Sequence, residues 1–170
     1  MKAYHFLGAD MTAGSGNEPA WKVGETRSIE GECVLCGRGY HSSPSWFDAL
    51  QYAPGAMACI VDVSEPVQKD ETKQVSHQRT LVDCRDATRM LHLFAIECAE
   101  RALKGANVTD ERCWNALKVK RDWLDGTATD AELDAAWAAA LAARDAAESW
   151  QRTRLDEMMA ELFKAAGEGK

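Results

Sequence analysis

The first half of the chain alternates short apolar segments with turns. Residues 3–7 (AYHFL) alternate and carry two aromatic rings, which is typical of a half-buried strand. Residues 56–63 (AMACIVDV) form a nearly continuous apolar run, as expected for a central strand, and residues 73–83 alternate again. Residues 8–25 are rich in glycine and polar side chains and predict a loop. The pattern predicts a small, mostly antiparallel sheet.

One short helix is predicted among these strands. Residues 26–36 (TRSIEGECVLC) favour an extended segment that is interrupted at Gly31. Ser43 is then expected to cap a helix, with Pro44 at the first helical position. The sequence Pro-Gly that starts at Pro54 ends this helix.

The second half of the chain has helical periodicity. Apolar side chains recur at helical spacing over residues 86–105 and predict a first helix. Thr109 is expected to cap a second helix that ends before Gly126. Thr129 and Glu132 form a capping-box pattern at the start of a third helix. If this helix is unbroken to the end of its apolar pattern, it runs for roughly 36 residues, about 54 Å.

Together these patterns predict an α+β fold. A sheet portion with one short helix covers residues 1–83, and three helices, the last one long, cover residues 84–170. The two portions are expected to form one compact domain with a helical extension. Two arrangements of the last helix stay open: it folds back on its neighbours, or part of it docks on a second copy or on another protein.

Composition narrows the classes of function. The hydrophobic fraction of 46% and the charged fraction of 28% are typical of a soluble globular protein. The chain has no apolar run of the ~20 residues that a membrane span needs, and its N-terminus does not resemble a signal peptide. A cytoplasmic protein without membrane contact is therefore expected. The net charge of -7 argues against direct binding of nucleic acids, which requires a basic face.

The cysteines suggest one alternative chemistry. In the absence of an export signal, the six cysteines are expected to be reduced. Cys33, Cys36 and His41 follow the spacing C-x2-C-x4-H and offer three candidate ligands for Zn²⁺, but Trp46 occupies the position where a knuckle would place its fourth ligand. A tetrahedral zinc site would have to take a ligand from a neighbouring strand: Cys59, His77 or Cys84.

A second alternative comes from a resemblance. The segment GRGYHSSPSWFDALQYAPGAMACIVDV resembles the second-strand region of ADP-ribosyltransferase-like folds. The resemblance implies that Tyr40 stacks on nicotinamide and that His5 holds the ribose of NAD, with Ser42 nearby. That family also uses a glutamate on a late strand. Glu65 and Glu71 follow the apolar strand here, and neither is assigned to that role.

A broader resemblance covers more of the chain. In the segment from Cys36 to Gly55, a cysteine precedes a glycine-tyrosine-histidine turn, and a short helix ends in Ala-Pro-Gly; the residues of this pattern are Cys36, Gly39, Tyr40, His41, Ser43, Leu50, Tyr52, Ala53, Pro54 and Gly55. The pattern is similar to that of a family of small phage and prophage proteins of unknown function. This resemblance implies a viral or mobile-element origin.

The function expected first is therefore not enzymatic. We expect a phage-type accessory protein that binds a host or viral protein through its acidic surface and long helix, with self-association through the C-terminal helices left open. The expected contact residues are aromatic and methionine side chains: Trp137, Trp150, Met158, Met159 and Phe163. The alternatives are an ADP-ribosyltransferase-like, NAD-binding enzyme and a small zinc-binding interaction module.

Overall fold

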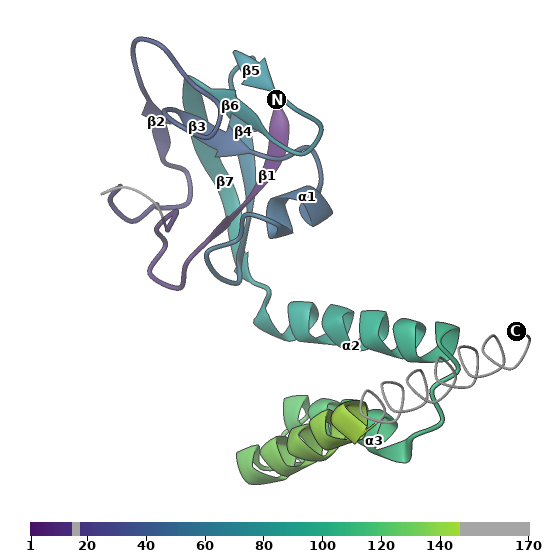
Figure 1. Ribbon diagram of the computed structural model, residues 1–170. Coiled ribbons are helices and arrows are strands. Elements are labelled where there is room, and N and C mark those ends of the chain that lie inside the picture. Colours follow the sequence, from purple (N-terminus) through teal and green to yellow (C-terminus); the bar gives the residue numbers. More distant parts are fainter. Residues whose placement is uncertain (15–17, 147–170) are drawn as a thin grey trace, which may run out of the picture. The chain divides into compact units, whose positions relative to one another are not determined.

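The chain forms two compact units, Met1–Leu91 and His92–Lys170. The computed structural model describes residues 1–14 and 18–146 (Figure 1). The boundary between the units falls near the start of a helix that covers Thr88–Gly105.

The first unit contains a four-stranded antiparallel sheet. Its strand order is β1 (Lys2–Leu7), β4 (Met57–Val63), β7 (Gln78–Asp86) and β2 (Thr26–Ser28) (Figure 1). The apolar run predicted as a central strand is β4, which pairs with β1 on one side and β7 on the other. The predicted antiparallel sheet is confirmed.

A second, three-stranded antiparallel sheet lies in the same unit. Its order is β3 (Tyr40–Ser42), β6 (Gln74–Ser76) and β5 (Gln68–Lys69). The single alternating strand predicted over residues 73–83 is in fact β6 followed by β7, and the chain changes sheet at His77. An alternating pattern shows that one face is buried, but it does not show which sheet buries it.

The core of the first unit lies on one face of the four-stranded sheet. Alternate residues of β4 point to this face, as the twofold repeat of a strand requires. The cluster consists of Ala3, Leu7, Trp21, Cys59, Val61, Val63 and Leu81. Trp21 comes from the long loop after β1, so this loop is held against the sheet by a buried indole ring.

The short helix α1 (Trp46–Leu50) begins later than predicted. Its N-cap is Ser45, whose hydroxyl accepts a hydrogen bond from the backbone N–H of Asp48 at 3.1 Å. The predicted cap, Ser43, is wrong because the backbone of this residue forms a bridge with Tyr4 of β1. Ser45, which lies directly before the helix and is not part of this bridge, is therefore the N-cap.

The second unit is helical. It contains most of α2 (Thr88–Gly105), then α3 (Glu111–Leu124) and a third helix that the structure describes over residues 130–146. This confirms the α+β class with three C-terminal helices. None of the described helices has both the length and the apolar character that crossing a membrane requires.

The helix caps of this unit are partly as predicted. Asp110, one residue after the predicted Thr109, caps α3 by accepting a hydrogen bond from the N–H of Arg112 at 2.9 Å. The capping box is confirmed: the N–H of Thr129 donates to the Glu132 carboxylate at 2.8 Å, and the N–H of Glu132 donates to the Thr129 hydroxyl at 3.3 Å.

Candidate functional site

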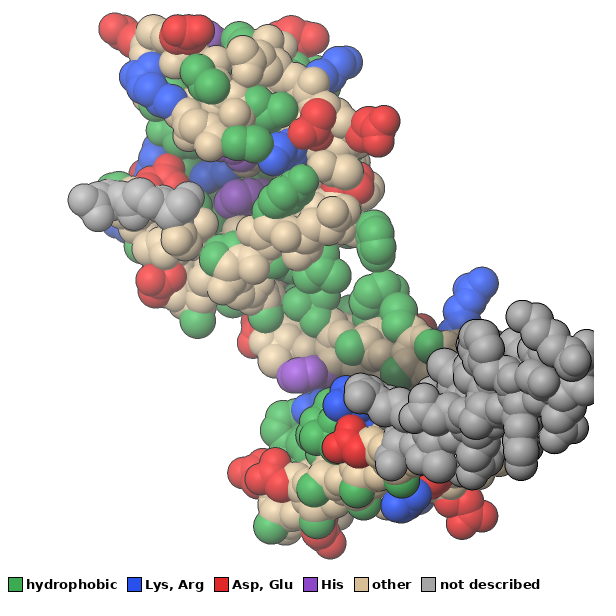
Figure 2. Space-filling view, in the orientation of Figure 1, with side chains coloured by type: hydrophobic (Ala, Val, Ile, Leu, Met, Phe, Trp, Pro, Cys, Tyr) green, Lys and Arg blue, Asp and Glu red, His purple; other side chains and the backbone are tan. Residues whose placement is uncertain are grey.

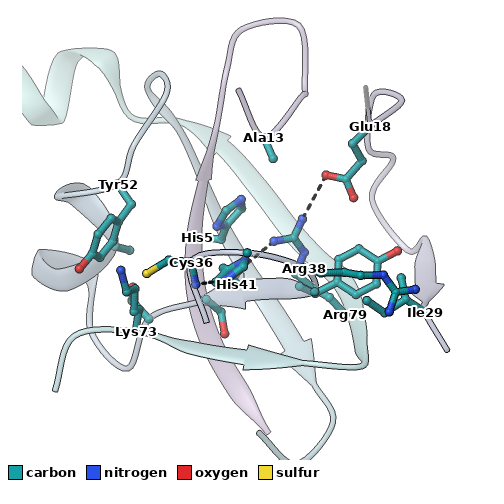
Figure 3. A pocket seen from close by; sticks show the side chains of 16 residues that line it. His5, Ala13, Glu18, Ile29, Cys36, Arg38, His41, Tyr52, Lys73 and Arg79 are labelled. Carbon is teal, nitrogen blue, oxygen red and sulfur yellow. Dashed lines mark hydrogen bonds and ion pairs between the residues drawn. The ribbon is translucent and has the colours of Figure 1, made fainter. Parts of the chain in front are cut away.

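A pocket of about 650 Å³ opens in the first unit. On the face of the first unit that is visible in Figure 2, histidine side chains lie close to lysine or arginine side chains. The pocket is lined by residues from both sheets, from α1 and from loops (Figure 3). His5, Tyr40 and Ser42 are among these lining residues. The three residues that the transferase resemblance singled out are therefore brought together, although 35 positions separate the first from the second.

His5 presents an unpartnered nitrogen. It lies on β1 opposite Cys59 of β4, and its Nε2 atom is enclosed without a hydrogen-bond partner among the described residues. Burial holds the pKa of His5 well below its ordinary 6.5, and the charges of Arg79 and His41 lower it further. The imidazole is therefore neutral at pH 7, and its Nε2 atom is a buried polar atom whose hydrogen-bonding capacity is unused among the described residues.

Arg79 is a buried charge in the same pocket. Its side chain, on β7, is 3% exposed, and its Nη1 atom donates a 2.9 Å hydrogen bond to the carbonyl of His41. The guanidinium lies 4.4 Å from the ring centroid of Trp21 and 5.3 Å from that of Tyr40, and its Nη2 atom lies 3.7 Å from Glu18. Burial lowers the pKa of Arg79 to about 10, so the group stays charged at neutral pH.

Tyr40 is positioned by the glycine before it. Gly39 has φ +131°, and a Cβ atom there would lie 2.4 Å from Cγ2 of Val75. Only glycine lets β3 approach β6 in this way. The Tyr40 ring meets Trp21 edge to face at 5.7 Å. Burial, with the Glu18 carboxylate as the next cause, raises the pKa of Tyr40, so its hydroxyl is protonated and can donate.

Ser42 lines the pocket but its hydroxyl is already engaged. The side-chain amide of Gln74 donates a 3.2 Å hydrogen bond to the Ser42 hydroxyl, and both side chains are buried. This bond joins β3 to β6. Ser42 therefore acts first as a support for the wall that carries Tyr40.

The pocket is basic although the chain is acidic. Arg38, Lys73 and Arg79 line it, and Glu18 is the acidic side chain among its described lining residues, so three positive charges face one negative charge. The chain as a whole carries -7. Sequence reasoning missed this feature because the three cations are far apart in the sequence and no basic run shows them.

The three predicted zinc ligands do not converge on one point. Cys33 places its sulfur 3.3 Å from Nδ1 of His77, whereas the backbone N–H of Cys36 donates to Nε2 of His41 at 3.0 Å. The Cys36 side chain is hydrogen-bonded to Lys73, which raises the pKa of that lysine. Within residues 1–14 and 18–146, no group of three or more histidine, cysteine or acidic side chains is placed to hold a metal ion.

Of the predicted contact residues in the second unit, one is described. Trp137 lies on the helix of residues 130–146 and is 58% exposed. Trp150, Met158, Met159 and Phe163 lie outside the described residues.

These features define the first unit as a small α+β domain that carries a basic, partly enclosed pocket. The chain belongs to the family described as Domain of unknown function (DUF7666), whose model matches residues 1–93. The match includes every residue that lines the pocket. The comparisons with curated proteins and with solved structures gave no match.

Proposed function

We propose that the first unit is an ADP-ribosyltransferase-like domain that binds NAD in this pocket. The observation that carries the proposal is the convergence of His5 and Tyr40, the two residues to which the resemblance gives the ribose and the nicotinamide, on one cavity with an excess of positive charge. A match of two ligand-facing positions in space is more specific than the short sequence motif that suggested them.

His5 offers a site for a ribose hydroxyl. A buried nitrogen without a hydrogen bond destabilises a protein by about 1–3 kcal/mol. A ligand hydroxyl that forms a hydrogen bond with Nε2 would remove this penalty. Because the imidazole is neutral, one of its two ring nitrogens can accept a hydrogen bond from such a hydroxyl.

The other lining groups fit the remaining parts of a dinucleotide. The Tyr40 ring offers a stacking surface, and the cations Arg38, Lys73 and Arg79 suit phosphate oxygens. The cavity volume of about 650 Å³ falls within the range of roughly 300–1,000 Å³ that is common for small-molecule sites.

Binding of NAD and cleavage of NAD are separate parts of the proposal, and the lining residues support binding. Glu65 and Glu71, the glutamates considered from the sequence, are not among the residues that line the pocket. A transferase breaks the bond between nicotinamide and ribose, so release of free nicotinamide from NAD reports turnover separately from binding.

The test is a calorimetric titration of the purified chain with NAD. We expect binding by the unmodified chain and at least about fivefold weaker binding by Tyr40→Leu, since loss of an aromatic stacking partner costs about 1–3 kcal/mol. Tyr4→Leu is the matched control, because Tyr4 packs on Trp46 and is not among the pocket-lining residues. Absence of any heat with millimolar NAD would refute the proposal.

A second candidate function rests on the other unit. We propose that the helix of residues 130–146 contacts a host or phage protein, or a second copy of the chain, as expected for a phage accessory protein in the bacterial cytoplasm. Trp137 and Leu141, four residues apart on one helix face, are 58% and 40% exposed. Exposed aromatic side chains of this kind are common anchors in protein interfaces.

Light scattering and affinity capture test this second candidate. We expect a mass above that of the monomer, or one enriched partner from phage-infected cells, and loss of either with Trp137→Ser. Ala138→Ser, at an exposed neighbouring position on a different side of the helix, is the control. A monomer that captures the same proteins before and after Trp137→Ser would contradict it.

A further inference from the structure

Glu18 faces two arginines without bonding closely to either. Its carboxylate oxygens lie 3.7 Å from Nη2 of Arg79 and 3.5 Å from Nη1 of Arg27. Close hydrogen bonds between nitrogen and oxygen are about 2.7–3.2 Å long. The carboxylate therefore offsets the charge of Arg79 but forms no close hydrogen bond with its N–H groups.

Arg79 has donors to spare. A guanidinium carries five N–H groups, and among the described residues the Arg79 side chain makes one hydrogen bond, to the carbonyl of His41. The side chain is 3% exposed, so bulk water does not serve the others. The Arg79 guanidinium also lies over the rings of Trp21 and Tyr40, and a ring face is not a conventional hydrogen-bond acceptor. A buried cation with unused donors is stabilised by an anion that lies within hydrogen-bond distance of them.

Arg27, in contrast, does not depend on Glu18. Glu25 bonds to it with both carboxylate oxygens, at 2.7 Å to Nε and 3.0 Å to Nη2. The Arg27 guanidinium also donates to the backbone carbonyls of Pro19 and Ala20, at 2.8 and 2.7 Å. Glu18 can therefore turn away without leaving Arg27 unpaired.

We propose that Arg79 is the phosphate subsite of the pocket, and that Glu18 occupies it in the free protein and is displaced by the ligand. The ligand class is a phosphate or diphosphate ester. A phosphate group offers several strong acceptor oxygens to a guanidinium, which matches its paired donors better than a carboxylate 3.7 Å away. The inference rests on the proposed function in assigning the diphosphate of NAD to Arg79, and it deepens that function.

The charges of the pocket support this ligand class. With Glu18 displaced, Arg38, Lys73 and Arg79 present three positive charges, and a diphosphate diester brings two negative charges. A cationic ligand would be repelled by the same three groups, and a neutral apolar ligand would leave Arg79 without an anion. The Glu18 side chain is 23% exposed, so it can reach water when it leaves Arg79.

The experiment measures competition between Glu18 and added anions. Inorganic pyrophosphate and NAD are titrated separately into the full chain, into Glu18→Gln and into the control Glu25→Gln. We expect Glu18→Gln to bind pyrophosphate about tenfold more tightly than the unmodified chain, since a charged competitor has been removed without a change of shape. Glu25→Gln should stay within about twofold, because Glu25 pairs with Arg27 and does not line the pocket. A further variant, Arg79→Lys combined with Glu18→Gln, should lose the gain.

The outcomes separate the two proposals. Tighter pyrophosphate binding by Glu18→Gln without any NAD binding would support the subsite and refute NAD as the ligand. NAD binding that Glu18→Gln leaves unchanged or weakens would refute the subsite and keep the proposed function. Absence of pyrophosphate binding to both the chain and Glu18→Gln would also overturn the subsite.

Discussion

Arg79 on β7 donates a 2.9 Å hydrogen bond to the carbonyl of His41 on β3. These strands belong to different sheets, so one buried side chain ties the four-stranded sheet to the three-stranded sheet. The pocket lies where they meet, and both residues line it. The hydrogen bond that joins the two sheets is thus formed by two residues that also line the candidate site.

Replacement of Arg79 by methionine should lower the free energy of unfolding by about 2–3 kcal/mol, because the His41 carbonyl loses its donor inside the protein. Arg85→Met, on the same strand, should change it by less than about 0.5 kcal/mol, since Arg85 is 80% exposed and pairs with Asp83 at the surface. Urea unfolding compares the two. Similar losses in both variants would contradict the role assigned to Arg79.

Gly39→Ala should destabilise the first unit by about 2 kcal/mol or more, because the new methyl group would overlap Val75, which is fully buried and cannot move aside easily. Gly24→Ala is the control. Gly24 also has a positive φ, +85°, but beyond its two chain neighbours no atom of the described residues lies within 4 Å of the added Cβ, so only backbone strain of about 1 kcal/mol is expected. Thermal unfolding of the two variants checks this, and equal shifts would argue against the steric reason.

Much of the fold was predictable from local patterns. The apolar run of residues 56–63 identified the central strand, because a strand with a neighbour on each side is shielded from water along most of its length. The capping box of Thr129 and Glu132 was predictable because all its atoms come from one turn. His5 and Tyr40 were named through a family resemblance, and both line the pocket, while the roles that the resemblance gives them stay a proposal.

Features that depend on contacts between distant residues were not predictable. Ser43 was expected to cap α1, but its backbone is held by Tyr4, 39 positions earlier in the chain. The split of residues 73–83 at His77 depends on which sheet each part joins. The basic pocket was missed for the same reason, since its cations are adjacent only after the sheets have formed.

Cys59 should resist thiol reagents in the folded protein. Burial raises the pKa of its thiol, and a 3.1 Å contact with the sulfur of Cys84 raises it further. The reactive species of a cysteine is the thiolate, so Cys59 has little of it at pH 8. Cys36 and Cys98 are exposed and should be labelled first. Mass spectrometry of time-resolved labelling checks the order, with Cys36→Ser removing one fast site. Labelling of Cys59 at the rate of Cys36 would contradict it.

The last prediction concerns acid. The pKa of His5 in the folded chain lies well below 6.5, its ordinary value and the one expected after unfolding. Between these two values the unfolded chain binds the extra proton, so the free energy of unfolding rises with pH across that window. The stabilisation is fully present above pH 6.5 and is lost as pH falls towards the folded pKa.

The slope due to His5 approaches about 1.4 kcal/mol per pH unit within this window. His41, whose pKa burial also lowers, adds to the slope in the same direction. His5→Gln should therefore flatten the pH dependence without abolishing it. Urea unfolding of both chains at pH 7.5, 6.5, 5.5 and 5.0 measures the effect. Parallel curves for the two proteins would show that His5 takes up its proton as easily in the folded chain as in the unfolded one, and that the unpartnered imidazole is not shielded from water.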